Sequence, residues 1–422
     1  MEKVGSVFFF VGGITNPYQQ VKFDYQGNTV EETFSVNVVR KHKPNSQAFV
    51  FLPHSLWEAE KDKYAQKGSF GFLFLPSMGT TGGKLYQATY EYLILWIFLN
   101  MLKFYMENKD TLEEIYVDIS LGLNIYVETL KEGFRTLALF DRLMNLSDEN
   151  TRNKKFYILF SDPVFPPQEA HITRKISEKE IQTQAWFDSP IKGFRREIYD
   201  RLGIDRKYVN MLEEFYHTYK AVKFNAPLAV YTFGYHQHEE ILSAIKELTD
   251  YFLKAYSPED YEERENKIIY RRMPDEETIK TVQNMLLSLA LYYNLSKTLE
   301  QEGVLKTDEV EAEALRNSFN RIYKRYGLFV NCMLLNADIN RWMNKKETIA
   351  EEKRFLYQYN TSKRKRNTKS LSSRNFFAHS GFEDNSTLVR KQGDKLLFMY
   401  NRDVRDKIRN LIADENMEVC GL

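Results

Sequence analysis

The hydrophobic pattern of this chain changes near residue 175, and that change limits what the chain can fold into. Before it, short apolar runs of strand length alternate with longer helical stretches. Short apolar strands between helices are typical of a mostly parallel sheet that is buried on both faces. The strands are expected at 6–11, 34–39, 48–52, 71–75, 115–119 and 155–160, and helices at 86–106 and 125–144.

After residue 175 the strand-like runs almost vanish and long amphipathic stretches replace them, at 207–222, 238–256, 276–301 and 308–331. Apolar residues recur there every three or four positions, which predicts helices. The apolar segment 228–233 fits either a strand or a helix, and the charged segment 257–274 reads as a surface connection or a charged helix. The prediction is an N-terminal α/β domain over 1–175 and an all-α part over 176–422.

The composition is that of an ordinary globular chain of 422 residues, with 59 Lys and Arg against 58 Asp and Glu. Because the net charge is only +1, nucleic acid could be bound only by a local basic patch. The two cysteines, Cys332 and Cys420, match no zinc spacing, which indicates a reducing compartment and no structural metal. The apolar run 93–99 is interrupted by Asn100 and Lys103, so we expect a cytoplasmic protein without a membrane span.

Polar loops that contain glycine follow several of the expected strands. In such sheets ligands bind outside the carboxyl ends of the strands, where glycine lets the backbone approach and helix starts attract anions. The pattern favours a ligand cleft, and ordinary strand-to-helix turns are the alternative. No phosphate-loop or dinucleotide fingerprint is present, since Leu85 follows Lys84 in TTGGK. The loop residues are Gly12, Gly13, Thr15 and Asn16; His54 and Ser55; Thr80, Thr81, Gly82 and Lys84, expected just before a helix; and Ser120, Gly122 and Asn124.

Near the C-terminus the segment LSSRNFFAHSGF places Arg374 five positions before His379. On an ideal helix these side chains would point ~140° apart, so they do not share a face. Either they lie at a helix start or irregularity, with Ser372 or Ser373 as the N-cap, or two copies of the chain share one site. Metal-free RNA cleavage needs a base, an acid and a cation at the phosphate, and a symmetric pair of Arg and His residues would supply them. Asn375 could donate to a phosphate oxygen, whereas the bland alternative for His379 is a packed core histidine.

A run of cations lies just upstream of this segment. It is a patch for a polyanion such as RNA, a solvated loop, or a run similar to a nuclear-import signal. The run consists of Lys363, Arg364, Lys365, Arg366 and Lys369.

The other histidines carry less information. His236 and His238 lie beside Glu239 and Glu240, but no third metal ligand stands at a usual spacing, so we interpret them as a solvated helix start. The remaining histidines are isolated in the sequence: His42, His54, His171 and His217.

The segment RNFFAHSG, from Arg374 to Gly381, resembles the R-x-x-x-x-H motif of HEPN ribonucleases. The N-terminal half resembles a CARF domain, a Rossmann-like sensor, in LPHSL, in DISLGLN from Asp118 to Asn124, and in FSDP at 160–163. In order and length the whole chain is similar to the CARF–HEPN accessory ribonucleases of type III CRISPR systems, whose C-terminal part is a HEPN helical bundle.

This resemblance implies a mechanism. A cyclic oligoadenylate, made after foreign RNA is detected, binds across a CARF homodimer and switches on a HEPN dimer that cuts single-stranded RNA without metal, which leaves 2′,3′-cyclic phosphate ends. Arg374 and His379 match the catalytic pair, and Asn375 matches a common neighbour. No cofactor or metal is expected, and assembly beyond the dimer is open.

The activator site is expected in the CARF loops. Where the CARF turn often carries Thr-His, this chain has Ser120 and Leu121, so the ring size stays open, with cyclic tetra-adenylate favoured over cyclic hexa-adenylate. Thr15, Asn16, Gly122, Leu123 and Asn124 match family positions that touch the messenger, and Gly13, Ser55, Thr80, Thr81 and Ser120 join them from the loops named above.

Two alternatives remain at this point. The chain could be a non-catalytic sensor that binds nucleic acid through its basic run, although such a regulator would not need both Arg374 and His379. It could also be a HEPN toxin ribonuclease under a control other than a cyclic nucleotide.

Overall fold

The computed structural model describes residues 3–13, 20–122, 124–147, 154–162, 173–359 and 373–414, apart from the side chains of residues 373 and 374. The chain forms two compact units that interleave along the sequence. Unit 1 comprises Met1–Arg142, Thr151–Gln184 and Lys246–Gln283, and unit 2 comprises Leu143–Asn150, Ala185–Ile245 and Asn284–Leu422. The division into functional domains after residue 175 remains a prediction.

Unit 1 is built on an eight-stranded sheet with the order β3-β2-β10-β9-β8-β1-β4-β5. The run from β9 to β5 is parallel throughout, as the sequence predicts. β10 pairs antiparallel with β9, and the β2–β3 hairpin extends that edge. The strands are β1 Ser6–Val11, β2 Val21–Tyr25, β3 Asn28–Glu32, β4 Ser46–Pro53, β5 Gly71–Leu75, β8 Glu114–Asp118, β9 Lys155–Ser161 and β10 Arg174–Glu180.

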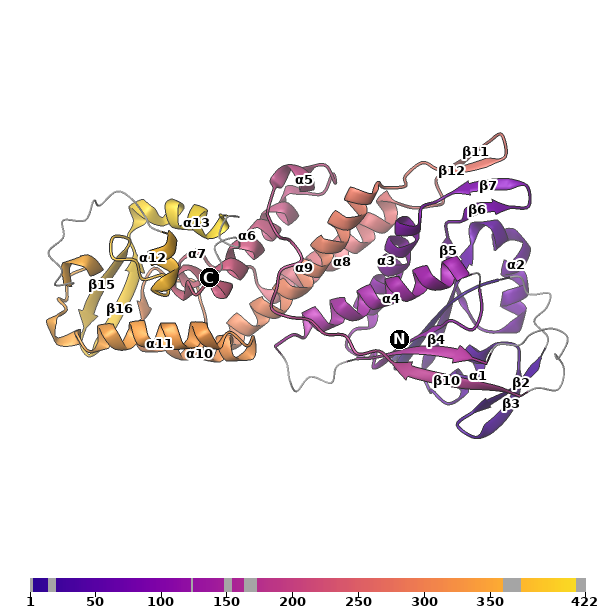
Figure 1. The fold of residues 1–422 in the computed structure, drawn as a ribbon, viewed down its shortest axis with the longest axis horizontal. Helices are drawn as coiled ribbons and strands as arrows, with labels where there is room; N and C mark the ends of the chain where they lie inside the picture. Colours follow the sequence, from indigo (N-terminus) through magenta and orange to yellow (C-terminus); the bar gives the residue numbers. More distant parts are fainter. Residues whose placement is uncertain are drawn as a thin grey trace. The chain divides into compact units, whose positions relative to one another are not determined.

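Helices cover both faces of this sheet, which explains why all six residues of β1 are buried. Side chains alternate between the two faces along a strand. The ring of Phe10 therefore packs against Tyr64 of α2, with centroids 6.2 Å apart, and the ring of Phe9 packs against Phe104 of α3, with centroids 6.0 Å apart. The helices of unit 1 are α1 Ser35–Lys41, α2 His54–Lys67, α3 Tyr90–Asn108 and α4 Asn124–Met144 (Figure 1).

The expected strand at 34–39 is wrong, because this segment forms helix α1. Three valines within it suggested a strand, since β-branched residues are enriched there. In the fold Val36 and Val39, three residues apart, are both buried with Phe34 in the core of unit 1, and this packing outweighs the propensity.

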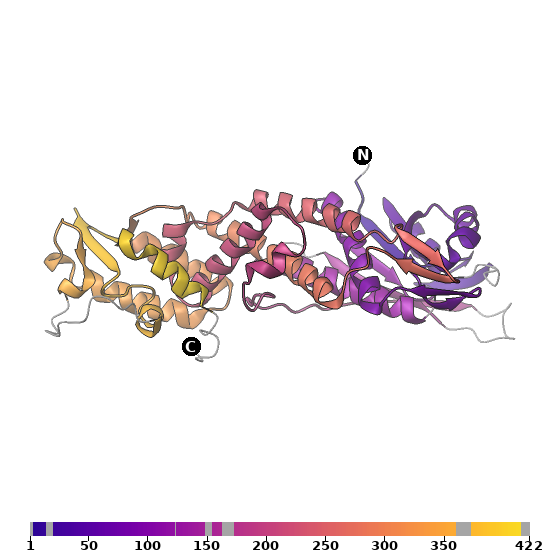
Figure 2. The ribbon, with the colours of Figure 1, turned by 90° about the horizontal axis from the view of Figure 1, so that it is seen from above.

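A second, four-stranded sheet in unit 1 has the order β11-β12-β7-β6. Its strands are β6 Met78–Thr81, β7 Lys84–Gln87, β11 Tyr261–Arg264 and β12 Lys267–Tyr270. The interpretation of 257–274 as a plain connection or a charged helix is therefore wrong, since a hairpin forms there around Glu265 and Asn266, both with positive φ. In Figures 1 and 2 this hairpin lies beside β7 although the two are far apart in the sequence, and Ile268 pairs with Tyr86.

Unit 2 is predominantly helical, as expected. The stretch 308–331 is two helices rather than one, because Gly327 takes a left-handed φ of 70° between them. The apolar segment 228–233 proves to be helical, after Pro227 at the first helical position. The helices are α5 Arg196–Asp200, α6 Arg206–Lys223, α7 Pro227–Phe233, α10 Ala312–Arg325, α11 Phe329–Met343, α12 Ser373–Ala378 and α13 Arg405–Ala413, while α8 His238–Ala255 and α9 Glu276–Gln301 belong partly to each unit.

Unit 2 also contains a small antiparallel sheet, with the order β13-β16-β15-β14, that the sequence analysis did not anticipate. Its central hairpin turns at Gly393, which has a φ of 55°. The strands are β13 Val310–Glu311, β14 Arg354–Phe355, β15 Thr387–Gln392 and β16 Lys395–Tyr400, and short 3-10 turns lie at η1 Lys346–Thr348, η2 Leu356–Tyr359 and η3 Arg402–Val404. Among the described helices of both units, none combines the length and apolar character needed to cross a membrane.

Candidate functional site

The segment with Arg374 and His379 forms the short helix α12 and the turn that ends it. Arg374 lies in the first turn, and His379 follows the last helical residue. Ser380 takes a left-handed φ of 52°, and the amide of Gly381 donates to the carbonyl of Phe376 at 2.8 Å, which closes the helix. Arg374 therefore lies at a helix start, which is one of the two placements considered for the five-residue spacing, although its side chain lies outside the described residues.

Two phenylalanines fix α12 to the core of unit 2. Phe376 is fully buried against Tyr400, with ring centroids 6.1 Å apart, and Phe377 packs edge-on against Phe224 at 5.9 Å. The side chain of His379 is nevertheless 47% exposed. The alternative reading of His379 as a packed core histidine is thus wrong, because its two aromatic neighbours are buried while the imidazole faces outward.

The turn after His379 tolerates no side chain at Gly381. A Cβ there would lie 2.8 Å from the hydroxyl oxygen of Tyr400 and 3.2 Å from the Cα of Ala226. The φ of 77° adds a second requirement for glycine. The hydroxyl of Tyr400 donates to the carbonyl of Gly381 at 3.1 Å, so this turn is tightly held.

A buried carboxylate lies behind His379. Asp338, from α11, places Oδ1 3.4 Å from the Nδ1 atom of His379, and its Oδ2 accepts from the hydroxyl of Ser380 at 2.8 Å. The side-chain nitrogen of Asn225 donates to the same hydroxyl at 3.0 Å, and the hydroxyl of Tyr323 donates to the side-chain oxygen of Asn225 at 3.1 Å. This network ties the turn at His379 to α10, to α11 and to the loop between α6 and α7.

The electrostatics of this network suit an oriented imidazole. The Asp338 side chain is only 11% exposed, and burial raises its pKa, while the Ser380 hydroxyl and the His379 ring act in the opposite direction. A carboxylate beside Nδ1 favours the tautomer with the proton on that nitrogen, which leaves Nε2 to accept a proton. Asp338 was missed in the sequence because it lies 41 residues before His379. The only feature of the sequence that could have indicated Asp338 is that this acidic residue stands next to the apolar positions of an amphipathic helix.

The remaining residues predicted for this region are less informative. Asn375 is exposed in the first turn of α12. The basic run Lys363, Arg364, Lys365, Arg366 and Lys369 lies outside the described residues, and so does Cys420.

In unit 1 the loops after β4, β1 and β8 lie at one edge, because these three strands are parallel neighbours. This arrangement brings Gly13, Ser55, Ser120 and Gly122 to the same side of the sheet, and Asn124 begins α4 beside them. The predicted residues Thr15, Asn16 and Leu123 lie outside the described residues.

Hydrogen bonds hold these loops in place. The amide of Gly13 donates to the hydroxyl of Tyr64 at 2.8 Å, and the hydroxyl of Ser120 accepts from the amide of Ser161 at 2.8 Å. Ser120 also donates its amide to the buried carboxylate of Asp118 at 2.8 Å. The edge is a pre-formed polar rim, of the kind at which α/β sheets bind ligands.

Thr80 and Thr81 do not lie in a strand-to-helix turn, as the sequence suggested. Both belong to β6 of the second sheet, next to a turn at Gly82 and Gly83 with left-handed φ values. The two glycines that suggested an anion-binding helix start instead close a hairpin, so no helix start lies at this loop.

His54, which looked isolated in the sequence, lies at the first position of α2 among aromatic rings. The centroid of Tyr261 is 4.4 Å from that of His54, and the His54 Nδ1 atom is 3.1 Å from the hydroxyl of Tyr270. Burial, helped by the charge of Lys84, lowers the pKa of His54 to about 4. The same Tyr270 hydroxyl accepts from the amide of Ser77 at 2.7 Å, so the β11–β12 hairpin contacts the loop after β5.

Beside His238 and Glu239 the fold places a third candidate metal ligand, Glu300, which the sequence did not reveal. Glu300, from α9, accepts from the Nδ1 atom of His238 at 2.6 Å, and Glu239 lies 3.0 Å from its Nε2. One ligand atom from each residue lies within 4.8 Å of the others, so these three could hold a divalent ion. In the structure, however, both ring nitrogens of His238 are already paired with the two carboxylates.

Comparison with known families matches both halves of the chain. The family model for the CARF domain of the CRISPR system endoribonuclease Csx1 matches residues 6–163, which hold β1 to β9 and the loops of the polar rim. The model for the HEPN domain of the same endoribonuclease matches residues 328–402, which hold α11, α12 and the turn at His379. No curated protein matches the chain. On these two matches, and on the sensor-like sheet and helical motif that they cover, the chain belongs to the CARF–HEPN accessory ribonucleases of CRISPR systems.

Proposed function

We propose that this CRISPR ribonuclease cuts single-stranded RNA without a metal ion, that it acts as a homodimer, and that a cyclic oligoadenylate bound to its CARF domain activates it. The observation that carries the catalytic part is the half-exposed His379 imidazole, backed by the buried Asp338 carboxylate at the end of the helix that bears Arg374.

The chemistry follows from the orientation of this imidazole. With Nδ1 toward Asp338, the Nε2 atom of His379 is available to take the proton of a ribose 2′-hydroxyl. The 2′-oxygen then attacks the phosphorus, the 5′-oxygen leaves with a proton from a second imidazole, and a 2′,3′-cyclic phosphate remains. The guanidinium of Arg374 would stabilise the charge that builds up on the phosphate oxygens. One histidine holds one proton at a time, so the second imidazole is expected from the partner subunit.

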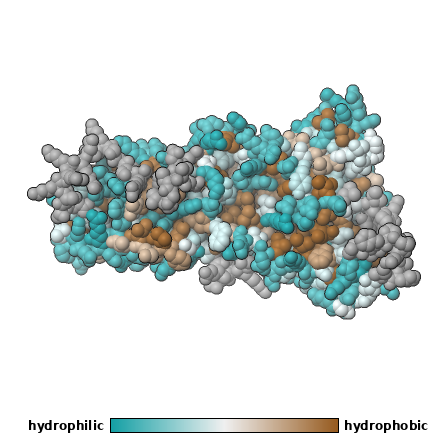
Figure 3. Space-filling view, viewed as in Figure 1, coloured by the Kyte–Doolittle hydropathy of each residue, from teal (hydrophilic) through white to brown (hydrophobic). Residues whose placement is uncertain are grey.

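An exposed apolar face on α11 supports the dimer. Phe329, Val330 and Met333 have 62%, 67% and 72% of their surface exposed, and Leu334 has 39%. Figure 3 shows a brown and tan patch over α10 and α11. Leu334 and Asp338 are one helical turn apart, so this apolar face runs toward the residue that backs His379. A second copy packed on this face would bring its own catalytic turn close.

The polar rim of unit 1 is the proposed activator site. A cyclic oligoadenylate repeats phosphate and adenine around a ring, and a two-fold dimer can contact such a ring with the same loops twice. Gly13, Ser55, Ser120 and Gly122 are the described residues proposed to contact it, together with Asn124. Cyclic tetra-adenylate is the favoured ring and cyclic hexa-adenylate the alternative. The undescribed Thr15, Asn16 and Leu123 remain proposed contacts on the strength of the family match.

The catalytic proposal is tested with Arg374→Ala and His379→Ala in the full-length protein. Each variant should lose at least 1,000-fold of the RNA cleavage rate, about 4 kcal/mol of transition-state stabilisation, while its unfolding curve stays that of the wild type. Wild-type activity should persist in EDTA, and the products should end in 2′,3′-cyclic phosphate. Strict dependence on a divalent ion, or full activity in either variant, would contradict the mechanism.

The activator proposal is tested with a panel of cyclic oligoadenylates. The ring that activates cleavage should also raise the melting temperature, since a ligand that binds only the folded state stabilises it. Cleavage that requires no messenger, with no shift in melting temperature for any ring, would instead favour a toxin-like ribonuclease under other control.

A further inference from the structure

Unit 2 contains a cavity of about 140 Å³ between α6, α7 and α13 that the catalytic site does not use. Its apolar wall includes Val230 and Phe233 of α7 and Ile412 of α13. A cavity of roughly 150 Å³ is enough to bind a benzene-sized ring. The space therefore matches a single flat ring, with an aromatic side chain available beside it.

The opposite wall is polar. Glu214, His217 and Thr218 line it, all from α6. The Nδ1 atom of His217 is buried and finds no hydrogen-bond partner among the described residues. Burial, helped by the nearby charge of Arg409, lowers the pKa of His217 to about 4, so this imidazole is neutral at neutral pH. A buried polar atom without a partner is rare in folded proteins, and a bound polar ligand would supply one.

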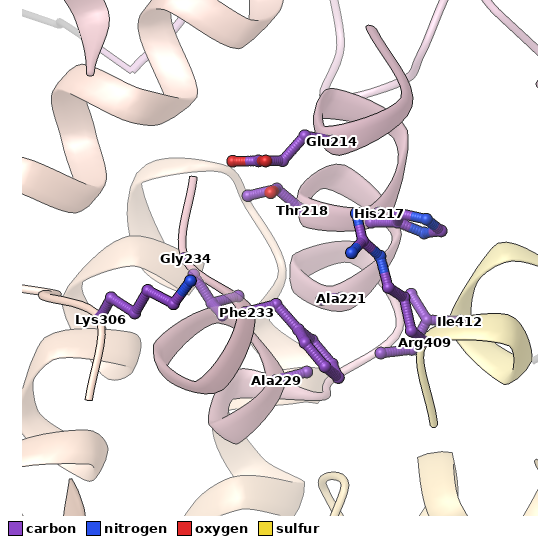
Figure 4. Close-up of a pocket in the computed structure, with 11 residues that line it drawn as sticks. Glu214, His217, Thr218, Ala221, Ala229, Phe233, Gly234, Lys306, Arg409 and Ile412 are labelled. Atoms are coloured by element: carbon purple, nitrogen blue, oxygen red, sulfur yellow. The ribbon is translucent and has the colours of Figure 1, made fainter. Parts of the chain in front are cut away.

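Two cations stand at the margins of the cavity. Lys306 and Arg409 are both exposed, and within the part of the chain that the structure describes neither forms an ion pair. Figure 4 shows Lys306 on one side and Arg409 beside His217 on the other, with Glu214 and Thr218 along the top. Since the histidine is neutral, two positive charges outweigh the single carboxylate, and the site favours an anion.

A flat ring with a polar edge and an attached anion is the chemistry of a nucleotide. We propose that this cavity is a nucleotide-binding subsite for the RNA substrate, in which the base lies beside Phe233 and its phosphate contacts Lys306 and Arg409. This proposal rests on the proposed ribonuclease function. The Glu214 carboxylate only accepts hydrogen bonds, so at the 4-position of a pyrimidine it accepts from the amino group of cytosine and is repelled by the carbonyl oxygen of uracil, which favours cytosine there. Aromatic side chains beside bases are a general feature of single-strand recognition.

The cavity and the hydrogen-bond network behind His379 adjoin in the sequence. Helix α6, which lines the cavity with Glu214, His217 and Thr218, ends at Lys223, and Asn225, two residues later, holds Ser380 next to His379. Both places belong to unit 2. One nucleotide in the cavity and the scissile phosphate at His379 would thus be within reach of one short RNA strand.

The test measures binding of CMP, UMP and inorganic phosphate to the full-length His379→Ala protein, which cannot turn over RNA if the proposed function holds. CMP should bind at least 10-fold more tightly than UMP or phosphate. Glu214→Gln should remove the preference for CMP over UMP, and the double variant Lys306→Gln, Arg409→Gln should weaken CMP binding at least 10-fold. Arg402→Gln is the matched control, because its side chain is 81% exposed in the same unit and contacts only Asp308 among the described residues; it should bind CMP as the parent does.

A second arm uses the catalytically competent protein. Arg409→Gln should raise KM for a cytosine-containing RNA at least fivefold and leave kcat within twofold, since the cavity binds substrate but does not touch the reacting atoms. Equal binding of CMP and phosphate would show an anion site only, and no CMP binding, or CMP binding unchanged in the double variant, would overturn the proposal. Because CMP binding is measured without cleavage, a failure of the ribonuclease function is distinguishable from a failure of this site.

Discussion

The carboxylate behind His379 allows a quantitative prediction. Replacing Asp338 with asparagine keeps the size of the side chain and leaves an oxygen that can still accept from Ser380, but it removes the negative charge 3.4 Å from the His379 Nδ1 atom. In the proposed mechanism that imidazole becomes a cation when it takes the 2′-hydroxyl proton. Asp338 would then be a positioning residue whose charge matters most in the transition state.

The size of the effect follows from the geometry. Two unit charges 3.4 Å apart interact by about 1 kcal/mol at the dielectric constant of water and about 5 kcal/mol at an effective value of 20. His379 is half-exposed while Asp338 is mostly buried, so we expect a loss in the lower part of this interval, about 1.4–2.7 kcal/mol. That corresponds to a 10-fold to 100-fold decrease in kcat.

The assay is cleavage of a fluorogenic single-stranded RNA under saturating activator, with kcat and KM determined separately and urea unfolding measured in parallel. Asp394→Asn is the matched control, because this carboxylate of unit 2 is 97% exposed and pairs only with Lys346 among the described residues. Asp338→Asn should lower kcat and leave KM within about twofold. A kcat within twofold of the wild type, in a variant of unchanged stability, would refute the role assigned to Asp338.

Three further predictions concern stability and assembly. Gly381→Ala should lower the free energy of unfolding by about 2–4 kcal/mol, because φ is 77° and the new Cβ would lie 2.8 Å from the Tyr400 hydroxyl oxygen; an unchanged urea midpoint would contradict this. The pKa values of His54 and His217 are lowered to about 4, so below pH 6.5 the unfolded chain binds more protons than the folded chain. The free energy of unfolding should therefore be highest above pH 6.5 and should decrease by about 1–2 kcal/mol for each histidine as the pH falls toward 4. His54→Asn should flatten this dependence in unfolding curves recorded at several pH values, and an equally steep dependence would argue against it. Met333→Glu, on the exposed face of α11, should shift sedimentation toward monomer and lower RNA cleavage at least 10-fold, whereas a fully active monomer would contradict the shared site.

The strands and long helices could be predicted from the sequence because their signals are local. The apolar run Ser6–Val11 is β1, and the amphipathic stretch Glu276–Gln301 is α9, both with the predicted bounds. Segment 34–39 was mistaken for a strand because its valines favour extended structure, and only the packing of Val36 and Val39 against the sheet decides for a helix. The hairpin at 261–270 was missed because its turn uses Glu265 and Asn266 rather than the usual Asn-Gly pair.

The residues of the candidate sites also fall into those with a local signal in the sequence and those without one. Arg374 and His379 could be found because they lie in one short motif, whereas their supporting residues Asp338 and Asn225 come from distant segments that only the fold brings together. The third ligand candidate at His238, Glu300, was missed for the same reason, since it lies 62 residues away on another helix. Local sequence reasoning could find chemical groups but could not find their partners across elements.

The most direct test of the central claim is the initial rate of single-stranded RNA cleavage in EDTA, measured with and without cyclic tetra-adenylate for the wild type and for His379→Ala. We predict a rate that rises at least 100-fold with the messenger in the wild type and stays at background in the variant under both conditions. Messenger-stimulated cleavage that persists in His379→Ala would contradict the claim that this imidazole performs the reaction.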